Sequence, residues 1–199
     1  MIPVVSFVRL GGKCRHCGTR IRSVHLVAEL ACALVGATAF SVASTGVAVA
    51  GALFGWTLVA LALLDLHHFW LPDRLTLPFA ALGLVVAACG IGVPLRDSAI
   101  GATAGYLSLT SIAVAYRALR GRTGLGGGDP KLFMAVGAWV GWMMLPPVLL
   151  LASLIGLFSV ALRNVRGHKV TGDARVPLGT LLAIAAWPAW LITTASTMF

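Results

Sequence analysis

The sequence predicts an all-α protein: a polytopic transmembrane helix bundle of about seven spans, with its N-terminus in the cytoplasm. Hydrophobic residues make up 59% of the 199 residues, charged residues only 11%, and the mean hydropathy is +0.95. A water-soluble domain needs far more polar surface than this composition supplies. No cleavable signal peptide is visible, because the basic first 24 residues lack the apolar core that such a signal requires.

Apolar stretches indicate where the spans lie. A helix needs about 20 residues to cross the hydrocarbon core of a bilayer. Residues 131–162 are too long for one span and short for two, and Pro146-Pro147 offers a natural break between them. The stretches run over residues 25–43, 46–64, 75–93, 98–116, 131–145, 147–162 and 178–197.

Basic residues test this count of spans. Of the 15 Lys and Arg residues, 14 fall in the N-terminal segment or in the loops at 65–74, 117–131 and 163–175. Seven spans place all of these on the inner side and leave only Arg96 outside, as the positive-inside rule demands. Orientation in the bilayer therefore explains the net charge of +9, and no nucleic-acid partner is expected.

We expect two parts in the chain. Residues 1–24 form a basic cytoplasmic segment with one Cys-x-x-Cys pair, Cys14 and Cys17. Residues 25–199 form the transmembrane domain. No long linker and no internal repeat separates further domains.

Two aspartates stand out among the six acidic residues. Asp65 ends an apolar run at the inner end of the second span, and Asp129 follows three glycines at the inner start of the fifth. Ionisable groups beside spans are costly and usually functional. For Asp129, followed by Pro130, a helix N-cap is the alternative; for Asp73, which follows a proline, the N-cap is the favoured interpretation.

Two carboxylates that meet at one membrane depth share a proton, because both cannot ionise cheaply. One member then takes a proton from water that attacks a peptide carbonyl, and the other donates one. Helix dipoles predict that Asp129, at a helix N-terminus, is the base, and that Asp65, at a helix C-terminus, carries the proton.

The glycines before Asp129 permit close backbone approach. A phosphate-binding loop is not favoured, because the lysine and Ser/Thr register and the preceding strand are missing. We expect Gly126 and Gly128 to let an extended substrate or a neighbouring helix come near Asp129. A flexible linker is the alternative.

Both strings resemble those of the type IV prepilin peptidases, GxGD-type aspartyl proteases of the bacterial inner membrane. The family's first pattern, Asp-x-x-His-x-x-Leu-Pro-Asp, is matched in register by Asp65, His68, Leu71, Pro72 and Asp73. Its second pattern, Gly-x-Gly-Asp-x-Lys-Leu, is matched by Gly126, Gly128, Asp129, Lys131 and Leu132. The string Pro177-Leu178-Gly179 resembles the Pro-Phe-Gly string that opens the family's last span.

The resemblance implies an enzyme: an aspartic endopeptidase, with residues 25–199 as its transmembrane domain. It implies Asp65 and Asp129 as the catalytic pair, a multi-pass place in the inner membrane, and a cytoplasmic active site that needs no cofactor. The implied substrate is a prepilin or pseudopilin of a type IV pilus or type II secretion system, cleaved after a short basic leader. Supporting or substrate-binding residues would be Gly126, Gly128, His68, Asp73 and Lys131. His68 has a structural alternative, and for Lys131 membrane anchoring is the alternative.

The cysteines depart from the family pattern. Longer members carry an additional first span and two Cys-x-x-Cys pairs that together bind zinc, so this chain is expected to be a short form that lacks that span and the first of the two pairs. Cys14 and Cys17 supply two metal ligands, whereas a structural zinc site usually has four. His16, His25 or a second chain would be needed to complete the site, and a reduced dithiol is the favoured interpretation.

Two other functions compete with proteolysis. A proton-coupled transporter also uses intramembrane carboxylates, but transporters often show internal repeats and broken helices near the midplane. Neither is evident here, and both aspartates fall at one interface. A catalytically inactive assembly scaffold is the third possibility. The sequence does not indicate an oligomeric state.

Overall fold

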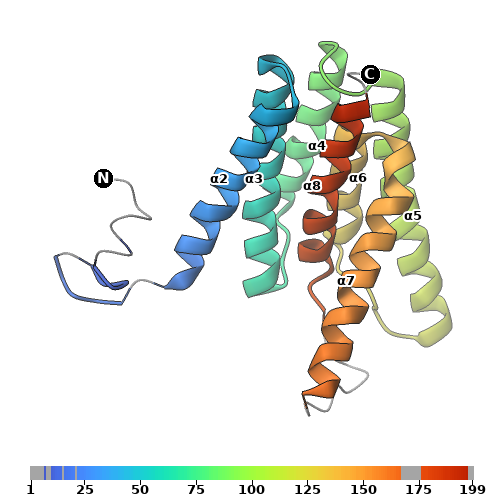
Figure 1. Cartoon of the computed structure of the whole chain (residues 1–199). Coiled ribbons are helices and arrows are strands. Elements are labelled where there is room, and N and C mark those ends of the chain that lie inside the picture. Colours follow the sequence, from blue (N-terminus) through green and yellow to red (C-terminus); the bar gives the residue numbers. More distant parts are fainter. Residues whose placement is uncertain (1–6, 8–9, 15, 21, 167–175, 197–199) are drawn as a thin grey trace. The chain divides into compact units, whose positions relative to one another are not determined.

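The computed structural model describes residues 7, 10–14, 16–20, 22–166 and 176–196. These residues form seven α-helices of 12 residues or more, and the all-α prediction is confirmed (Figure 1). Four basic residues of the charge argument lie outside the described part of the chain: Arg9, Arg15, Lys169 and Arg175.

Each helix covers one of the apolar stretches. Five segments of the described chain are long and apolar enough to cross a bilayer. Four of them are the helices α2, α3, α5 and α8, and the fifth, Trp142–Val165, contains α7. The protein is therefore a multi-pass membrane protein. The helices are α2 (Ser23–Val42), α3 (Thr45–His68), α4 (Asp73–Ala88), α5 (Leu95–Arg120), α6 (Asp129–Val140), α7 (Leu145–Val165) and α8 (Leu178–Ser196).

Helices α4 and α6 are shorter than a full span. With 16 and 12 residues, they are about 24 and 18 Å long at 1.5 Å per residue, against a hydrocarbon core of about 30 Å. In α6, ten of the 12 residues are buried. Contacts with α4, α5, α7 and α8 surround it, so its polar ends are shielded by protein.

The break between α6 and α7 comes earlier than the sequence predicts. Gly141, with φ of 78°, ends α6, and a 3₁₀ turn over Trp142–Met144 follows. The two prolines, Pro146 and Pro147, lie in the first turn of α7 instead of between the helices. Proline is tolerated there because the first helical N–H groups have no partner within the helix.

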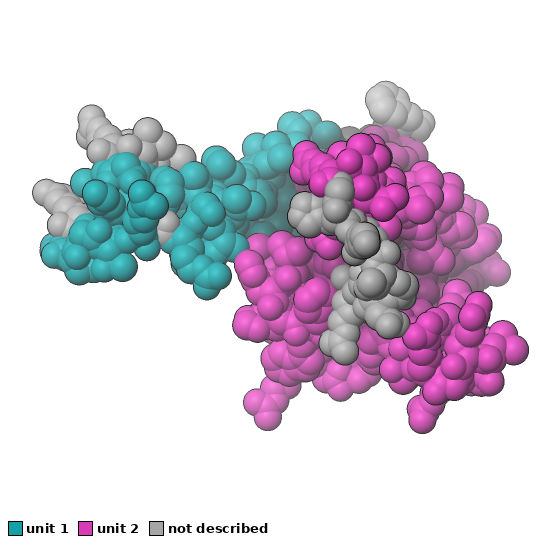
Figure 2. All heavy atoms as spheres, turned by 90° about the horizontal axis from the view of Figure 1, so that it is seen from below, with its two compact units in different colours: residues 1–60 teal, residues 61–199 magenta. Residues whose placement is uncertain are grey.

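The chain divides into two compact units, Met1–Ala60 and Leu61–Phe199 (Figure 2). In the second unit, α5 and α6 make the most extensive helix contact. A Cβ added to Gly101 of α5 would overlap the backbone carbonyl of Gly137 of α6, and one added to Gly105 would lie 2.5 Å from the carbonyl oxygen of Phe133. Small residues let helix backbones approach this closely in membranes. The Ser98 hydroxyl also donates to the carbonyl oxygen of Ala138, at 2.5 Å.

Helix α4 holds another face of α6. The indole Nε1 of Trp139 donates to the carbonyl oxygen of Phe79 at 2.9 Å, and the rings of these residues lie 5.7 Å apart. Gly83 makes room for this indole, since a Cβ there would lie 2.8 Å from it. Helix α6, which carries Asp129, is thus fixed by α4 and α5.

Candidate active site

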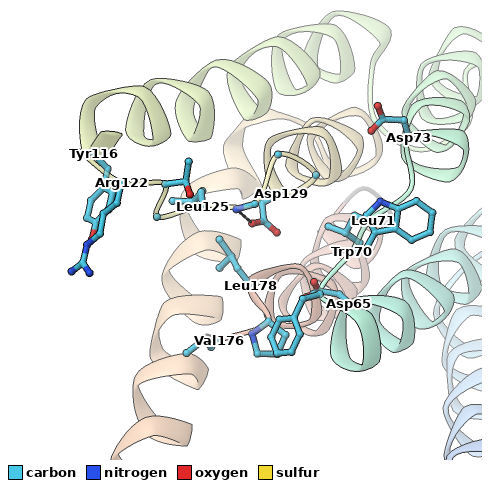
Figure 3. Close-up of a pocket in the computed structure, with 17 residues that line it drawn as sticks. Asp65, Trp70, Leu71, Asp73, Tyr116, Arg122, Leu125, Asp129, Val176 and Leu178 are labelled. Carbon is cyan, nitrogen blue, oxygen red and sulfur yellow. Dashed lines mark hydrogen bonds between the residues drawn. The ribbon is translucent and has the colours of Figure 1, made fainter. Parts of the chain in front are cut away.

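One pocket of the second unit, of about 980 Å³, is lined by both Asp65 and Asp129 (Figure 3). Its walls are the end of α3, the 69–73 segment, the end of α5 with the 122–128 loop, the start of α6, and the residues that lead into α8. The structure therefore brings together two residues that are 64 positions apart, as the sequence predicts. Asp65 is 5% exposed and Asp129 is 7% exposed.

The hydrogen-bond donors of Asp65 come from α8. The backbone N–H of Thr180 donates to Asp65 Oδ2 at 2.7 Å, and the Thr180 hydroxyl lies 3.2 Å from the same oxygen. These groups belong to the first turn of α8, where unpaired N–H groups favour a negative charge. Sequence reasoning considered only the negative pole of α3 and missed Thr180, because that residue lies 115 positions further along the chain.

Gly179 allows this approach. A Cβ at this position would lie 3.0 Å from both Cγ and Oδ2 of Asp65, and 2.8 Å from Cδ1 of Leu71. Any larger residue would push the start of α8 away from the carboxylate. The string Pro177-Leu178-Gly179 was the sequence signal for this contact, although it did not indicate the partner.

Asp129 is the first residue of α6 and does not cap it. The cap position is Gly128, and Asp129 Oδ2 instead accepts the backbone N–H of Gly126 at 3.0 Å. A Cβ on Gly126 would lie 3.0 Å from this oxygen, and one on Gly128 would lie 2.6 Å from Cβ of Leu71. Both glycines therefore serve close packing, which favours the close-approach interpretation over a flexible linker.

Burial and proximity give this pair its chemistry. Figure 3 shows the two side chains entering the same pocket, Asp65 from the end of α3 and Asp129 from the start of α6. Two carboxylates that come together in such a place cannot both ionise cheaply, which favours a state in which one of them keeps a proton. Such a pair can accept a proton and donate another in one reaction.

Asp73 and Lys131 form an ion pair beside this pocket. Lys131 Nζ lies 2.6 Å from Asp73 Oδ2, with the side chains 28% and 55% exposed. The prediction that Asp73 caps α4 is wrong, since the helix start has no side-chain cap and the carboxylate binds Lys131 instead. Lys131 follows Asp129 by two residues, so the pair joins the start of α4 to the start of α6.

The sequence pointed to His68 as a supporting residue, but in the structure its neighbour Phe69 lines the pocket instead. His68 is exposed at the end of α3 and is not part of the pocket lining. Phe69 lines the pocket and, among the described residues, is the only non-glycine residue with positive φ, 50°. This left-handed conformation ends α3 and turns the chain toward Leu71. No sequence signal marked Phe69, because bulky residues rarely adopt the left-handed backbone conformation.

Cys14 and Cys17 lie in a tight turn of the first unit. The N–H of Cys14 donates to the carbonyl oxygen of Thr19 at 2.9 Å, and the N–H of Gly18 to that of Cys14 at 3.0 Å. Hydrogen bonds from the hydroxyl and the backbone N–H of Thr19, and from Cys14, lower the pKa of the exposed Cys17 thiol from 9.0 to about 7. Within the described residues no three His, Cys, Asp or Glu side chains are grouped to hold a metal. The described residues alone therefore do not supply the four ligands that a structural zinc site usually has.

Comparison with known proteins identifies relatives. Residues 52–161, which include both Asp65 and Asp129, match the model of the type IV leader peptidase family, and residues 1–43 match the bacterial peptidase A24 N-terminal domain. A prepilin leader peptidase/N-methyltransferase of Aeromonas salmonicida (strain A449) is 43% identical over 192 residues, 96% of this chain and 65% of that protein.

Similar proteins occur in other bacteria. Proteins with the same name are 41% identical in Pseudomonas aeruginosa and 36% identical in Neisseria gonorrhoeae; the matches cover 96% and 95% of this chain, and 66% and 67% of those proteins. The chain thus spans about two thirds of the length of the curated relatives that it matches, 65% for the first of them. No solved structure matches this chain.

Proposed function

The chain belongs to the type IV leader peptidase family, and from this we propose that it is a membrane-embedded aspartyl endopeptidase that removes the basic leader from type IV prepilins or pseudopilins. One observation carries the proposal. Asp65 and Asp129, both within the range that matches the family, line a single pocket as buried carboxylates. Prepilin cleavage is also the activity named for relatives about 40% identical to this chain.

Hydrolysis by this pair needs no bound cofactor. The ionised carboxylate removes a proton from water, whose oxygen attacks the scissile carbonyl carbon, while the protonated carboxyl donates to the carbonyl oxygen. When the C–N bond breaks, the proton taken from water passes to the leaving amine. Burial strengthens these interactions because little water screens them.

The proposed site is cytoplasmic and the proposed membrane is the bacterial inner membrane. Support comes from the basic loops, which flank the ends of the helices that form the pocket. The pocket itself is lined by Asp65, Asp73 and Asp129 against one cation, Arg122. This excess of carboxylates suits a basic leader, although Asp73 is partly neutralised by Lys131.

The test is cleavage of a purified prepilin by the purified protein in anionic lipid vesicles. We expect the wild type to cut after the leader. Asp65→Asn and Asp129→Asn should each lower the rate of cleavage by at least about a thousandfold, because the two carboxyl groups act as a unit in acid–base catalysis. Mass spectrometry of the mature N-terminus identifies the scissile bond. Asp97→Asn is the matched control, because Asp97 lies in the first turn of α5 and bonds Trp142 Nε1 at 3.2 Å, outside the pocket lining.

Two results would contradict the proposal. Cleavage that survives either substitution would reject the catalytic pair. An intact wild type that leaves prepilins uncut under conditions in which a relative cuts them would reject the substrate.

A further inference from the structure

Thr180 has a hydroxyl with two acceptors and one hydrogen. Thr180 Oγ1 lies 3.0 Å from the carbonyl oxygen of Ala62 and 3.2 Å from Asp65 Oδ2. Because a hydroxyl donates one hydrogen at a time, it can serve either acceptor but not both fully. Thr180 is 8% exposed, so no bulk water competes for this hydrogen.

Both donors to Asp65 converge on one carboxylate oxygen. The backbone N–H and the hydroxyl of Thr180 are directed at Oδ2, and Oδ1 has no hydrogen bond to any described residue. Asp129, by contrast, accepts one hydrogen bond from the part of the chain that the structure describes, from the N–H of Gly126. Hydrogen bonds to a carboxylate favour its ionised form.

We propose that Thr180 is a positioning residue that presents Asp65 as the ionised member of the pair, with Oδ1 directed at the attacking water, while Asp129 carries the shared proton. This inference rests on the proposed function. It reverses the assignment that the helix dipoles of α3 and α6 alone predict, because the start of α8 contributes the stronger local donors.

The step balances in protons and bonds. Asp65 Oδ1 takes a proton from water, the water oxygen bonds to the carbonyl carbon, and Asp129 gives its proton to the carbonyl oxygen. The Thr180 hydroxyl then turns from Oδ2 to the carbonyl oxygen of Ala62, so that it keeps a partner when Asp65 is neutral. On cleavage of the C–N bond, Asp65 returns its proton to the amine, and the gem-diol gives one hydroxyl proton back to Asp129 as it becomes the carboxylic acid.

The other charged or titratable groups of the pocket do not account for the difference in hydrogen bonding between Asp65 and Asp129. Those that line the pocket with Asp65 are Asp129 of α6, Asp73 of α4, Tyr116 of α5 and Arg122 of the following loop. Among the described residues, both hydrogen bonds to the Asp65 carboxylate come from Thr180 and none from these four groups. The hydroxyl of Thr180 can therefore be removed without changing a charge in the pocket.

The first test needs no substrate. Infrared difference spectra of protein with ¹³C-labelled aspartate contain an Asp65 carboxylate band, assigned by its loss in Asp65→Asn. We expect Thr180→Val to shift this band, Thr180→Ser to restore its position, and Thr193→Val to leave it unchanged. Thr193 is the matched control, since its hydroxyl on the same helix bonds, among the described residues, only to the carbonyl oxygen of Ala189, at 2.9 Å. An unchanged band in Thr180→Val would overturn the proposal.

The second test is cleavage of the prepilin. Loss of one hydrogen bond to a charged group lowers kcat about ten- to a hundredfold. We expect KM to stay unchanged, because Thr180 is not among the residues that line the pocket. Thr180→Ser should recover kcat, and Thr180→Ala repeats the test if the valine variant does not fold. A Thr180→Ser variant as slow as Thr180→Val would show a structural role only. If the wild type cuts no prepilin, the proposed function fails, and the infrared result still decides the role of Thr180.

Discussion

Cys17 shows how neighbouring donors change the chemistry of a single exposed residue. Because the Thr19 hydroxyl, its backbone N–H and Cys14 bond the Cys17 sulfur, the pKa of this thiol falls from 9.0 to about 7. The thiolate, which is the reactive form, therefore accumulates as the pH rises through about 7. We expect the rate of alkylation of Cys17 by iodoacetamide to reach half its maximum near this pH, measured by mass spectrometry of the labelled peptide.

Thr19→Val supplies the comparison. It removes the largest of these stabilising hydrogen bonds and keeps the backbone N–H, so the midpoint for Cys17 should rise toward 9.0. A midpoint that stays near 7 in this variant would assign the reactivity to another cause. The result also bears on metal binding, since a thiolate is the form that ligates zinc.

Single residues also show what the sequence could and could not predict. Asp65 and Asp129 were identified correctly as a converging pair, because carboxylates beside apolar spans have few structural explanations. The N-cap prediction for Asp73 was wrong because its partner, Lys131, lies 58 positions away. Thr180 was missed for the same reason. Local patterns identify a charged residue, but its partners depend on how the helices pack.

At the scale of helices, the contact between α5 and α6 fixes the position of Asp129. Gly101 is the closest point, where the two backbones touch. We expect Gly101→Ala to destabilise the protein by about 1–3 kcal/mol, because the added methyl group has to separate the helices. Unfolding in a denaturant titration in detergent measures this change. Activity should fall as well, since α6 carries Asp129.

Gly46 in α3 is the matched control for Gly101. Both glycines are helical, but a Cβ at Gly46 meets no atom within 4 Å. Gly46→Ala should therefore be neutral or slightly stabilising, because alanine is favoured over glycine within helices by about 0.5–1 kcal/mol. Equal destabilisation by both variants would mean that helix packing at Gly101 is not limiting.

Helix lengths also separate the features that local sequence predicts from those that depend on helix packing. The seven apolar stretches predicted the number and order of the helices, because burial in lipid requires continuous apolar sequence. They did not reveal that α6 has only 12 residues and is enclosed by other helices. Enclosure is a property of packing, and Gly141, not the two prolines, sets the end of this helix.

For the whole molecule, the decisive property is its orientation in the membrane. The pocket lies where α3 ends and α6 begins, so it faces the cytoplasm only if the basic loops do. The ends of α5 report this directly. Its 26 residues span about 39 Å at 1.5 Å per residue, with Arg96 near one end and Arg120 at the other. Both side chains are exposed.

We expect a cysteine in place of Arg96 to react with a membrane-impermeant maleimide in intact cells, and one in place of Arg120 to react only after the inner membrane is permeabilised. The background carries alanine at the four native cysteines, Cys14, Cys17, Cys32 and Cys89. Because the predicted topology places 14 of the 15 basic residues on the side of Arg120, neither substitution should reverse the charge asymmetry that orients the chain. Labelling of Arg120→Cys in intact cells would place Asp65 and Asp129 on the outer face, where a cytoplasmic leader could not reach them.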